Sequence, residues 1–292
     1  MHLCIRYAFC NTFEVNNLKK ELGSFSLEQL TFSLKEGCIT GFIGVNGSGK
    51  TTTIKTILGL YPKDGGSIKF FGKEMEKNEY EIKNRIGVVL DEGYFYEEMT
   101  LKEMKSIIAP AYTNWDESVF LNYINCFNLK LNQKIATLSK GMRMKFAITL
   151  ALSHHADLLI MDEPTSGLDP LIRNELMEIL LDFMEEEGKS VFFSTHITSD
   201  LEKVADMLIL IDNGKIVFNE SKDEILERHA LIKGDNSLIN EHSTKLFLRL
   251  RQTPFGFEGI TNKVDQVCEQ MKDIIIERPT IEDVMLAYVK EG

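Results

Sequence analysis

Cysteine is scarce in this chain of 292 residues, and its few positions follow no pattern. An odd number of scattered cysteines gives no disulfide framework, and no Cys-x-x-Cys pair offers a zinc site of the usual spacing. The sequence therefore indicates a reducing compartment. We expect Cys38 and Cys126 to be small, buried hydrophobic residues. The five cysteines are Cys4, Cys10, Cys38, Cys126 and Cys268.

Long apolar runs are also missing. The run Met207–Ile211 has five residues, whereas a membrane-spanning helix needs about 20, so we predict no segment that crosses a bilayer. The first dozen residues lack the apolar stretch and the small-residue cleavage site of a signal peptide. They do not join the regular pattern that begins near Phe13, so we expect residues 1–12 to be either a loose tail or an overcalled start.

A basic excess is missing as well. The chain has 33 lysines and arginines against 44 aspartates and glutamates, which gives a formal net charge of −11. A surface of this sign gains little from displacing the counterions of nucleic acid, so we predict no nucleic-acid partner. The apolar content of 43% is ordinary for a globular protein, and a chain of this length buries most of its surface on folding.

Short apolar runs predict a series of buried strands. Leu30–Leu34 and Cys38–Ile43 are joined by Lys35-Glu36-Gly37, which predicts a hairpin. Asp212-Asn213-Gly214 between two further runs is a stronger hairpin signal. The other predicted strands are Ser67–Phe71, Gly87–Leu90, Leu158–Met161, Val191–Phe193, Met207–Ile211 and Lys215–Phe218.

Helical patterns alternate with these runs. Thr52–Leu60 carries its apolar residues on one face, Thr100 and Glu103 form a capping box, and Asp169-Pro170 opens a long helix. This alternation predicts an α/β fold with a mostly parallel sheet, to which the first strands add an antiparallel β subdomain. Residues 100–153 hold no clear strand and are expected to be an inserted helical subdomain. Residues 13–229 would form one domain, and residues 230–292 a small accessory unit with a strand at Lys245–Leu250 and a helix at Val264–Met271.

The segment from Gly44 to Thr51 fits the pattern G-x-x-x-x-G-K-[ST], with a predicted strand before it and a predicted helix after it. Its glycines allow backbone N–H groups to turn inward around a phosphate, and the helix adds its positive end. Lys50 supplies a cation for the β- and γ-phosphates, and the Thr51 hydroxyl coordinates Mg²⁺. The predicted nucleotide-binding residues are Gly44, Val45, Asn46, Gly47, Ser48, Gly49, Lys50, Thr51 and Thr52.

Two acids end the apolar run Leu158–Met161. Acids at this position lie at the carboxyl end of a buried strand, where open α/β sheets bind their ligands. Asp162 is expected to hold Mg²⁺ together with Thr51. Glu163 points differently because strand side chains alternate, and we expect it to polarise the attacking water. His196 closes another apolar strand and could reach the γ-phosphate, although a lone histidine there is more often an ordinary polar residue.

The phosphate loop alone fits kinases, GTPases and many motors, and the remaining motifs distinguish between them. Leu138-Ser139-Lys140-Gly141-Met142 resembles the LSGGQ signature of the nucleotide-binding subunits of ATP-binding cassette (ABC) transporters, and Ser139 lies 23 residues before Asp162. Ser166-Gly167-Leu168-Asp169 resembles the D-loop of that family, and His196 lies at the position of its switch histidine. A phosphate-loop kinase does not explain these motifs together.

The resemblance implies an ATPase that acts as a dimer. Two cassettes, identical or similar, would face each other head to tail, with each ATP between the phosphate loop of one and Ser139 and Gly141 of the other. The helix dipole at Ser139 would help to bind the γ-phosphate. The implied cofactors are ATP and Mg²⁺. The implied partners are a second cassette and a separate integral-membrane permease, so the chain would be cytoplasmic and peripheral on the inner face of the membrane.

Three positions depart from the family pattern. Lys140 and Met142 replace Gly and Gln of the signature, and Lys140 could add positive charge near the shared nucleotide. Asp91 stands where the family has the Q-loop Gln, from which it could ligate Mg²⁺ through water. Leu22 falls near the position of the adenine-stacking aromatic, and Phe25 could stack instead.

Two further segments bear on partner and cargo. Arg278–Leu286 resembles the ending common in export-type cassettes, which favours export of a lipid, drug or peptide over nutrient import. Tyr94-Phe95-Tyr96 are candidates for the groove that receives a permease helix, or else a hydrophobic core patch. A soluble cassette acting on ribosomes or chromatin is the alternative, but this chain has one phosphate loop and no sustained heptads.

Overall fold

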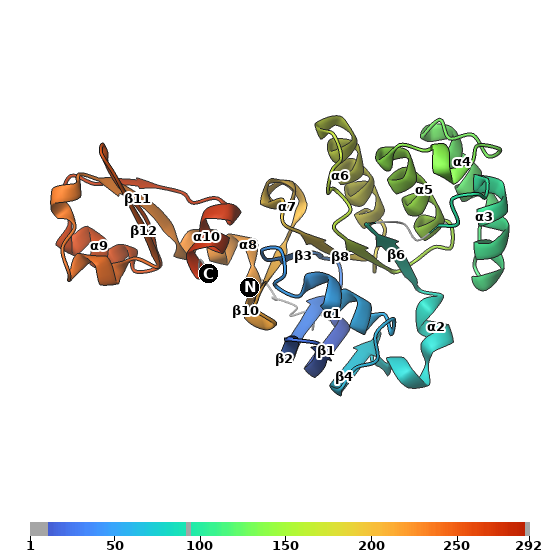
Figure 1. Ribbon diagram of the computed structural model, residues 1–292, viewed down its shortest axis with the longest axis horizontal. Coiled ribbons are helices and arrows are strands. Elements are labelled where there is room, and N and C mark those ends of the chain that lie inside the picture. The colour runs from blue at the N-terminus through green and yellow to red at the C-terminus, as the bar shows by residue number, and fades with distance from the viewer. Residues whose placement is uncertain (1–10, 92–94, 290–292) are drawn as a thin grey trace, which may run out of the picture.

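A six-stranded sheet forms the centre of the computed structural model, which describes residues 11–91 and 95–289 (Figure 1). Five neighbouring strands are parallel, and the sixth, β10, pairs antiparallel with β9 through the predicted Asn213-Gly214 turn. This confirms the mostly parallel sheet. In spatial order the strands are β10 (Lys215–Ser221), β9 (Met207–Asp212), β3 (Ile39–Ile43), β8 (Ser190–Thr195), β7 (Leu158–Asp162) and β6 (Ile86–Leu90).

Both faces of this sheet are covered, because its side chains alternate between two hydrophobic clusters. Phe193 of β8 joins the cluster that includes residues of α5, α6 and α7, and the preceding residue, Phe192, joins the cluster that includes α1 and the antiparallel strands. Every residue of β3 and of β7 is buried. The helices are α1 (Lys50–Ile57), α5 (Lys140–Leu152), α6 (Pro170–Met184) and α7 (Thr198–Val204).

A second sheet is antiparallel and packs on the central sheet through phenylalanines. The ring centroid of Phe32 in β2 lies 6.0 Å from that of Phe192 in β8 and 5.9 Å from that of Phe42 in β3. Aromatic pairs at such distances add to the stability gained from burial alone. The strands, in spatial order, are β2 (Phe25–Lys35), β1 (Asn11–Leu22), β4 (Gly65–Phe70) and β5 (Lys73–Glu74), and α2 (Glu79–Lys83) leads back to β6.

Two predictions at the start of the chain were wrong. The runs Leu30–Leu34 and Cys38–Ile43 form no hairpin, because β2 pairs with β1 whereas β3 pairs with β8 and β9. A short turn between two apolar runs also suits a chain that crosses between layers. Residues 11 and 12 of the predicted tail belong to β1, where the buried Thr12 Oγ1 lies 3.0 Å from Ser190 Oγ. The rest of that predicted tail, residues 1–10, lies outside the described residues.

The segment from residue 100 to residue 153 is helical, as predicted. It contains α3 (Leu101–Ile108), α4 (Glu117–Cys126) and α5, which share a hydrophobic cluster of their own, and the capping box of Thr100 and Glu103 opens α3. Cys126, at the end of α4, is exposed, so the expectation that it is buried was wrong, and Cys38 is half-buried.

A small four-stranded antiparallel sheet follows α8 (Lys222–Arg228) and packs against α9 (Val264–Gln270) with a separate core. The predicted strand at Lys245–Leu250 was wrong, since residues 243–246 form a turn of 3₁₀ helix and the strand begins at Arg249. The helix predicted from Val264 is α9. In spatial order the strands are β12 (Arg249–Thr253), β13 (Gly256–Thr261), β11 (Ala230–Gly234) and β14 (Ile275–Glu277).

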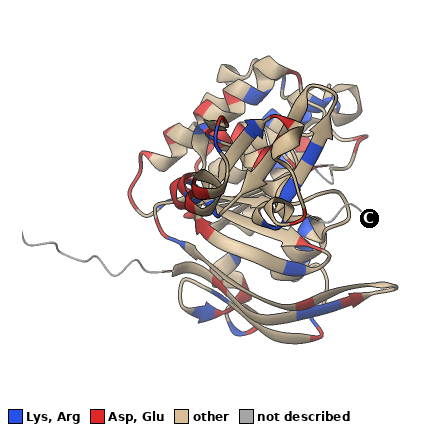
Figure 2. Cartoon of the chain, turned by 90° about the vertical axis from the view of Figure 1, so that its left-hand side faces the viewer, with Lys and Arg blue, Asp and Glu red and all other residues tan. Residues whose placement is uncertain are grey.

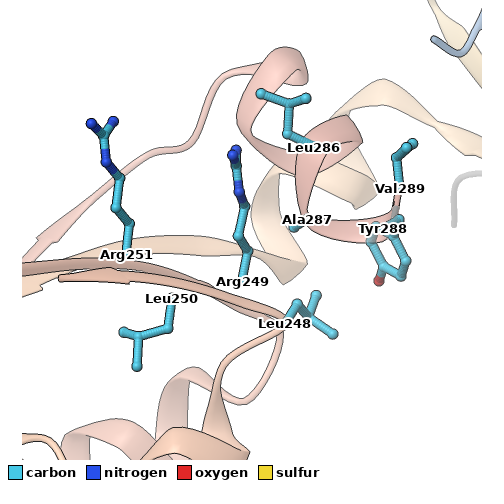
Figure 3. A pocket seen from close by; sticks show the side chains of 8 residues that line it. All are labelled: Leu248, Arg249, Leu250, Arg251, Leu286, Ala287, Tyr288 and Val289. Atoms are coloured by element: carbon cyan, nitrogen blue, oxygen red, sulfur yellow. The ribbon is translucent and has the colours of Figure 1, made fainter. Parts of the chain in front are cut away.

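The last helix, α10 (Ile281–Tyr288), leaves this small sheet and packs on the core of the central sheet. Its buried residues Ile281, Val284 and Met285 join the cluster that covers β3 and β8, and the Ile281 N–H donates to Glu202 Oε1 at 3.0 Å. Figure 3 shows the hollow of about 700 Å³ between α10 and β12, with Arg249 and Arg251 on one side of that strand. The domain boundary after residue 229 stays a prediction.

None of the helices in the described ranges has the length and apolar character needed to cross a membrane. In the view of Figure 2, lysines and arginines are interspersed with aspartates and glutamates.

Candidate ATP-binding site

Four of the sequence motifs meet around one hollow at the carboxyl ends of the parallel strands. The phosphate loop follows β3, Asp162 ends β7, His196 follows β8 and Asp91 follows β6. Because parallel strands end at the same edge of a sheet, segments far apart in the sequence become neighbours there. The hollow has a volume of about 660 Å³ and is lined by Leu22, Phe25, Asn46, Gly47, Gly49, Lys50, Thr51, Thr52, Asp91, Glu163, Ser166 and His196.

The backbone of the phosphate loop requires glycine at two positions of close approach. Gly49 has φ 114° and stands at the N-cap of α1, where only glycine is unstrained. A side chain at Gly44 would place its Cβ 2.4 Å from the carbonyl oxygen of Ile211, so the loop can lie against β9 only without one. The glycines therefore fix the shape of the loop.

Lys50 lies inside the loop that precedes it and is 5% exposed. Its Nζ donates to the carbonyl oxygen of Gly44 at 2.7 Å and to that of Val45 at 3.3 Å, and it lies 3.2 Å from Glu163 Oε1. The cation is thus held at the mouth of α1, where the first N–H groups of a helix face a bound anion.

Asp162 is a buried carboxylate that two hydroxyl groups hold in place. Its Oδ1 accepts from Ser194 Oγ at 2.7 Å and from Thr51 Oγ1 at 3.3 Å. Burial raises the pKa of Asp162 above its ordinary value, and these two hydrogen bonds oppose the rise. A desolvated carboxylate beside a threonine hydroxyl offers the hard oxygen ligands that Mg²⁺ prefers, so this pair fits such an ion.

Glu163 has the left-handed backbone conformation, with φ 49°, which is uncommon outside glycine. Its N–H donates to the carbonyl oxygen of Ser194 at 3.1 Å and lies 3.0 Å from Ser194 Oγ, so β8 supports the strained residue. Strain of this kind is concentrated at functional sites. The conformation turns the carboxylate toward Lys50 and toward His196, whose Nδ1 lies 2.6 Å from Glu163 Oε2.

Ser139 and Gly141 do not line this hollow. Ser139 is the N-cap of α5 and accepts from the N–H of Met142 at 3.2 Å, and Gly141 lies near Ile172 of α6. The N-terminus of α5, capped by Ser139, therefore lies outside the nucleotide hollow of its own chain.

Asp91 lines the hollow but is already paired. Its Oδ1 lies 2.7 Å from Nζ of Lys140, the residue that follows Ser139. Sequence reasoning noted both residues as departures and missed their contact. It also missed the part played by Ser194, which holds both Asp162 and Glu163 and whose only sequence signal is its position at the end of an apolar strand.

The aromatic residues divide between the hollow and a second groove. Phe25 lies over the phosphate loop, since its Cζ would be 2.8 Å from a Cβ placed on Gly49. Phe95 packs on Phe146 of α5 with ring centroids 5.2 Å apart, whereas Tyr96 is 64% exposed. Tyr94 lies outside the described residues. Phe95 also lines an apolar groove between β6, α3 and α5.

Comparisons with known proteins agree with this site. Residues 27–166 match the model of the family described as ABC transporter. The chain is 34% identical over 219 residues to the bacitracin transport ATP-binding protein BcrA of Bacillus licheniformis, which covers 74% of this chain and 72% of that protein. It is 32% identical over 213 residues to the lantibiotic transport ATP-binding protein SrtF of Streptococcus pyogenes, which covers 72% of this chain and 91% of that protein.

The chain belongs to the ATP-binding proteins of the ABC transporter family. A solved structure described as the ATP-binding subunit of an ABC transporter superposes with a TM-score of 0.67 at 29% identity, over 74% of this chain and 92% of that one. A nucleotide-free ATP-binding cassette superposes with a TM-score of 0.63 at 24% identity, over 74% and 94%, and shares the fold. As a member of this family, the ABC subunit binds ATP and hydrolyses it, and hydrolysis is coupled to transport through a separate membrane component.

Proposed function

We propose that this ABC subunit powers the export of a lipid, drug or peptide and works as an ATP-dependent dimer on the inner face of the cell membrane. The observation that carries the proposal is the contact of Lys50 and His196 with the two oxygens of Glu163, beside the pair of Thr51 and Asp162. The relatives named for bacitracin and lantibiotic transport support a cargo of this kind.

In this proposal the phosphate loop binds the nucleotide. Backbone N–H groups of residues 44–51 and the N-terminus of α1 surround the β- and γ-phosphates, and Lys50 moves from the carbonyl oxygens of Gly44 and Val45 to the phosphates. Phe25, which already lies over the loop, is positioned to stack on the base, with Leu22 beside it. Thr52 lines the same hollow at the start of α1.

Thr51 and Asp162 would hold the metal, with Asp91 as a further ligand through water. When bound, Mg²⁺ would neutralise the charge that develops on the phosphate oxygens. The buried Asp162 would be oriented for this role by the hydroxyl of Ser194.

Glu163 acts on the attacking water. The carboxylate accepts the proton of the water as its oxygen bonds to the γ-phosphorus, and the bond from that phosphorus to the β–γ bridging oxygen breaks to release ADP. His196, hydrogen-bonded through Nδ1, keeps Oε2 in place and leaves Nε2 available to the γ-phosphate. General-base assistance of this type contributes about 10²–10⁴-fold in rate.

The second cassette supplies the rest of the site. Ser139 and Gly141 lie outside the hollow of their own chain, so they are available to the γ-phosphate bound by a second cassette. The permease docks on the apolar groove between β6, α3 and α5, which Phe95 lines, and also contacts the exposed Tyr96, which follows Phe95 in the chain.

The test uses the full chain with Glu163→Gln, which keeps the shape of the side chain and removes the base. Light scattering should show a rise from 33.3 kDa to about twice that mass when ATP and Mg²⁺ are added. Lys50→Ala is the control, because it removes the phosphate cation and should stay monomeric. Failure of the Glu163→Gln chain to bind ATP, or to associate with itself or with a sister cassette, would refute the proposal.

A further inference from the structure

An ion pair within one chain joins the nucleotide hollow to the N-terminus of α5. Asp91 Oδ1 and Lys140 Nζ are 2.7 Å apart, and both side chains are about 40% exposed, at 39% and 42%. Asp91 follows β6 and lines the hollow beside Lys50 and Thr51, whereas Lys140 begins α5 immediately after Ser139. The pair therefore connects the segment at the Q-loop position with the segment that resembles the signature, and each of its two residues departs from the family pattern.

Two further contacts, one of Lys140 and one of Arg143, join the first turn of α5 to neighbouring segments. The Lys140 Nζ lies 3.5 Å from the place where a Cβ on Gly167 would stand, so the ammonium group also borders the segment that follows Glu163. One turn along α5, Arg143 pairs with Glu97 at 2.8 Å. Both ends of the segment from Asp91 to Glu97 are thus tied to the first turn of α5.

The ion pair of Asp91 with Lys140 changes the charge of the hollow that would receive the phosphates. Asp91 and Glu163 line the hollow, and Asp162 lies behind Thr51, so three carboxylates surround a site for a polyanion. Lys50 is paired with Glu163. Without Lys140, Asp91 would be an unpaired negative charge facing the phosphates, whereas with Lys140 it is neutralised before the nucleotide arrives.

We propose that Lys140 is a positioning residue for the nucleotide: its ion pair cancels the charge of Asp91 toward the phosphates and competes with Mg²⁺ for the same carboxylate. The inference rests on the proposed binding of ATP and Mg²⁺ in this hollow. Loss of Lys140 exposes a negative charge, which repels metal-free ATP and attracts Mg²⁺. Loss of Asp91 has the opposite effect on both ligands. Loss of both leaves the net charge of the site unchanged.

The experiment measures two affinities by calorimetry on the full chain: that for ATP in the presence of EDTA, and that for Mg²⁺ with ATP already present. Lys140→Gln should weaken the binding of metal-free ATP and strengthen that of Mg²⁺, each by about two- to fivefold, the range of a half-exposed ion pair. Asp91→Asn should shift both affinities in the reverse directions. The double variant should return both to within about twofold of the starting protein, as a charge-neutral replacement would.

A structural role of the pair would give another pattern, because all three variants would then weaken both ligands. The effects of the single variants should also shrink at about 1 M NaCl, where charges are screened over about 3 Å. Lys145→Gln is the matched control, since Lys145 lies on the same helix and pairs at 2.7 Å with Glu175 of α6, away from the hollow. It should leave both affinities unchanged.

The outcomes separate this inference from the proposed function. Shifts of the same sign in Lys140→Gln and Asp91→Asn, or a double variant whose affinities stay more than about twofold from those of the starting protein, would overturn the role of Lys140 and leave ATP binding intact. Absence of ATP binding in the unmodified chain would overturn the proposed function and this inference together.

Discussion

The imidazole Nδ1 of His196 lies 2.6 Å from Glu163 Oε2, while the other carboxylate oxygen of Glu163 lies 3.2 Å from Lys50 Nζ. Three segments that follow different strands are thereby joined through one carboxylate at the mouth of the phosphate loop. Groups linked in this way act on a reaction as a unit, so their contributions to the rate do not multiply.

The first prediction tests this linkage in the ABC subunit. Glu163→Gln should lower single-turnover phosphate release by about 10²–10⁴-fold, and His196→Ala should lower it by less, because the base is still present. The double variant should be no slower than Glu163→Gln alone. Multiplicative losses in the double variant would show that His196 acts independently of Glu163.

The second prediction concerns the cost of keeping Asp162 ionised. Burial raises its pKa above the ordinary value of 3.8. Between 3.8 and the raised pKa, the folded chain holds a proton that the unfolded chain has released, so stability falls as the pH rises through that window. Above it the penalty is constant. Asp162→Asn removes the penalty, so its melting temperature without nucleotide should equal or exceed that of the unmodified chain at neutral pH.

The same Asp162→Asn variant should lose the extra melting temperature that Mg²⁺ adds in the presence of ATP, because a metal ligand is gone. Thermal unfolding with ATP, in EDTA and in Mg²⁺, measures both effects. A variant that is less stable without nucleotide would indicate that Asp162 stabilises the fold through its hydrogen bonds with Ser194 and Thr51. It would contradict the expectation that the buried charge of Asp162 lowers stability and is present to bind the metal.

The third prediction concerns recognition of the base. Phe25→Ala should weaken ATP binding by about 1–3 kcal/mol, the usual contribution of an aromatic ring stacked on a base. Phe25→Trp keeps a stacking surface and should retain affinity. Equilibrium titration with a fluorescent ATP analogue measures both variants, and equal affinity of Phe25→Ala and the unmodified chain would exclude stacking by Phe25.

The fourth prediction separates docking from chemistry. Tyr96, which is 64% exposed and follows the groove residue Phe95 in the chain, should contribute to contact with the permease. Tyr96→Ala should reduce recovery of the permease in an affinity pull-down from detergent-solubilised membranes, while the hydrolysis rate of the isolated subunit is unchanged. Tyr80→Ala is the control, because Tyr80 is 69% exposed on α2, away from the groove. Equal losses in both variants would exclude a specific site.

The fifth prediction concerns acid. Burial lowers the pKa of His229, whose Nδ1 lies 2.7 Å from the carbonyl oxygen of Ile225 and whose Nε2 lies 2.9 Å from the Tyr288 hydroxyl. A group with a lowered folded pKa contributes its full stability above its ordinary value of 6.5 and loses it as the pH falls toward the folded pKa. His229→Gln does not titrate, so urea unfolding should show a shallower loss of stability below pH 6.5. An unchanged slope would assign the loss to other groups, such as the buried His154.

The sequence predicted the parts of the fold that depend on local patterns. The motifs around Lys50, Asp162 and His196 each follow an apolar strand, and strands of a parallel sheet end at one edge, so their meeting could be foreseen. The contact of Asp91 with Lys140 could not, because it depends on how the helical segment is oriented against β6.

The errors have the same origin. Two apolar runs around Lys35-Glu36-Gly37 look alike whether their strands pair with each other or part into different sheets, and only tertiary packing decides between the two. The segment Arg278–Leu286 was interpreted only through its resemblance to a family ending, which does not show that Val284 and its neighbours complete the core at β3 and β8.

That last contact has a consequence for the order of events at the ribosome. Ile281, Val284 and Met285 fill a cluster whose other members come from strands and helices translated much earlier. Domains usually fold from the N-terminal side while translation proceeds at about 5–20 residues per second. In this chain the apolar surface that α10 covers stays exposed to water until residues 281–288 have left the ribosome, so this part of the core closes late in synthesis.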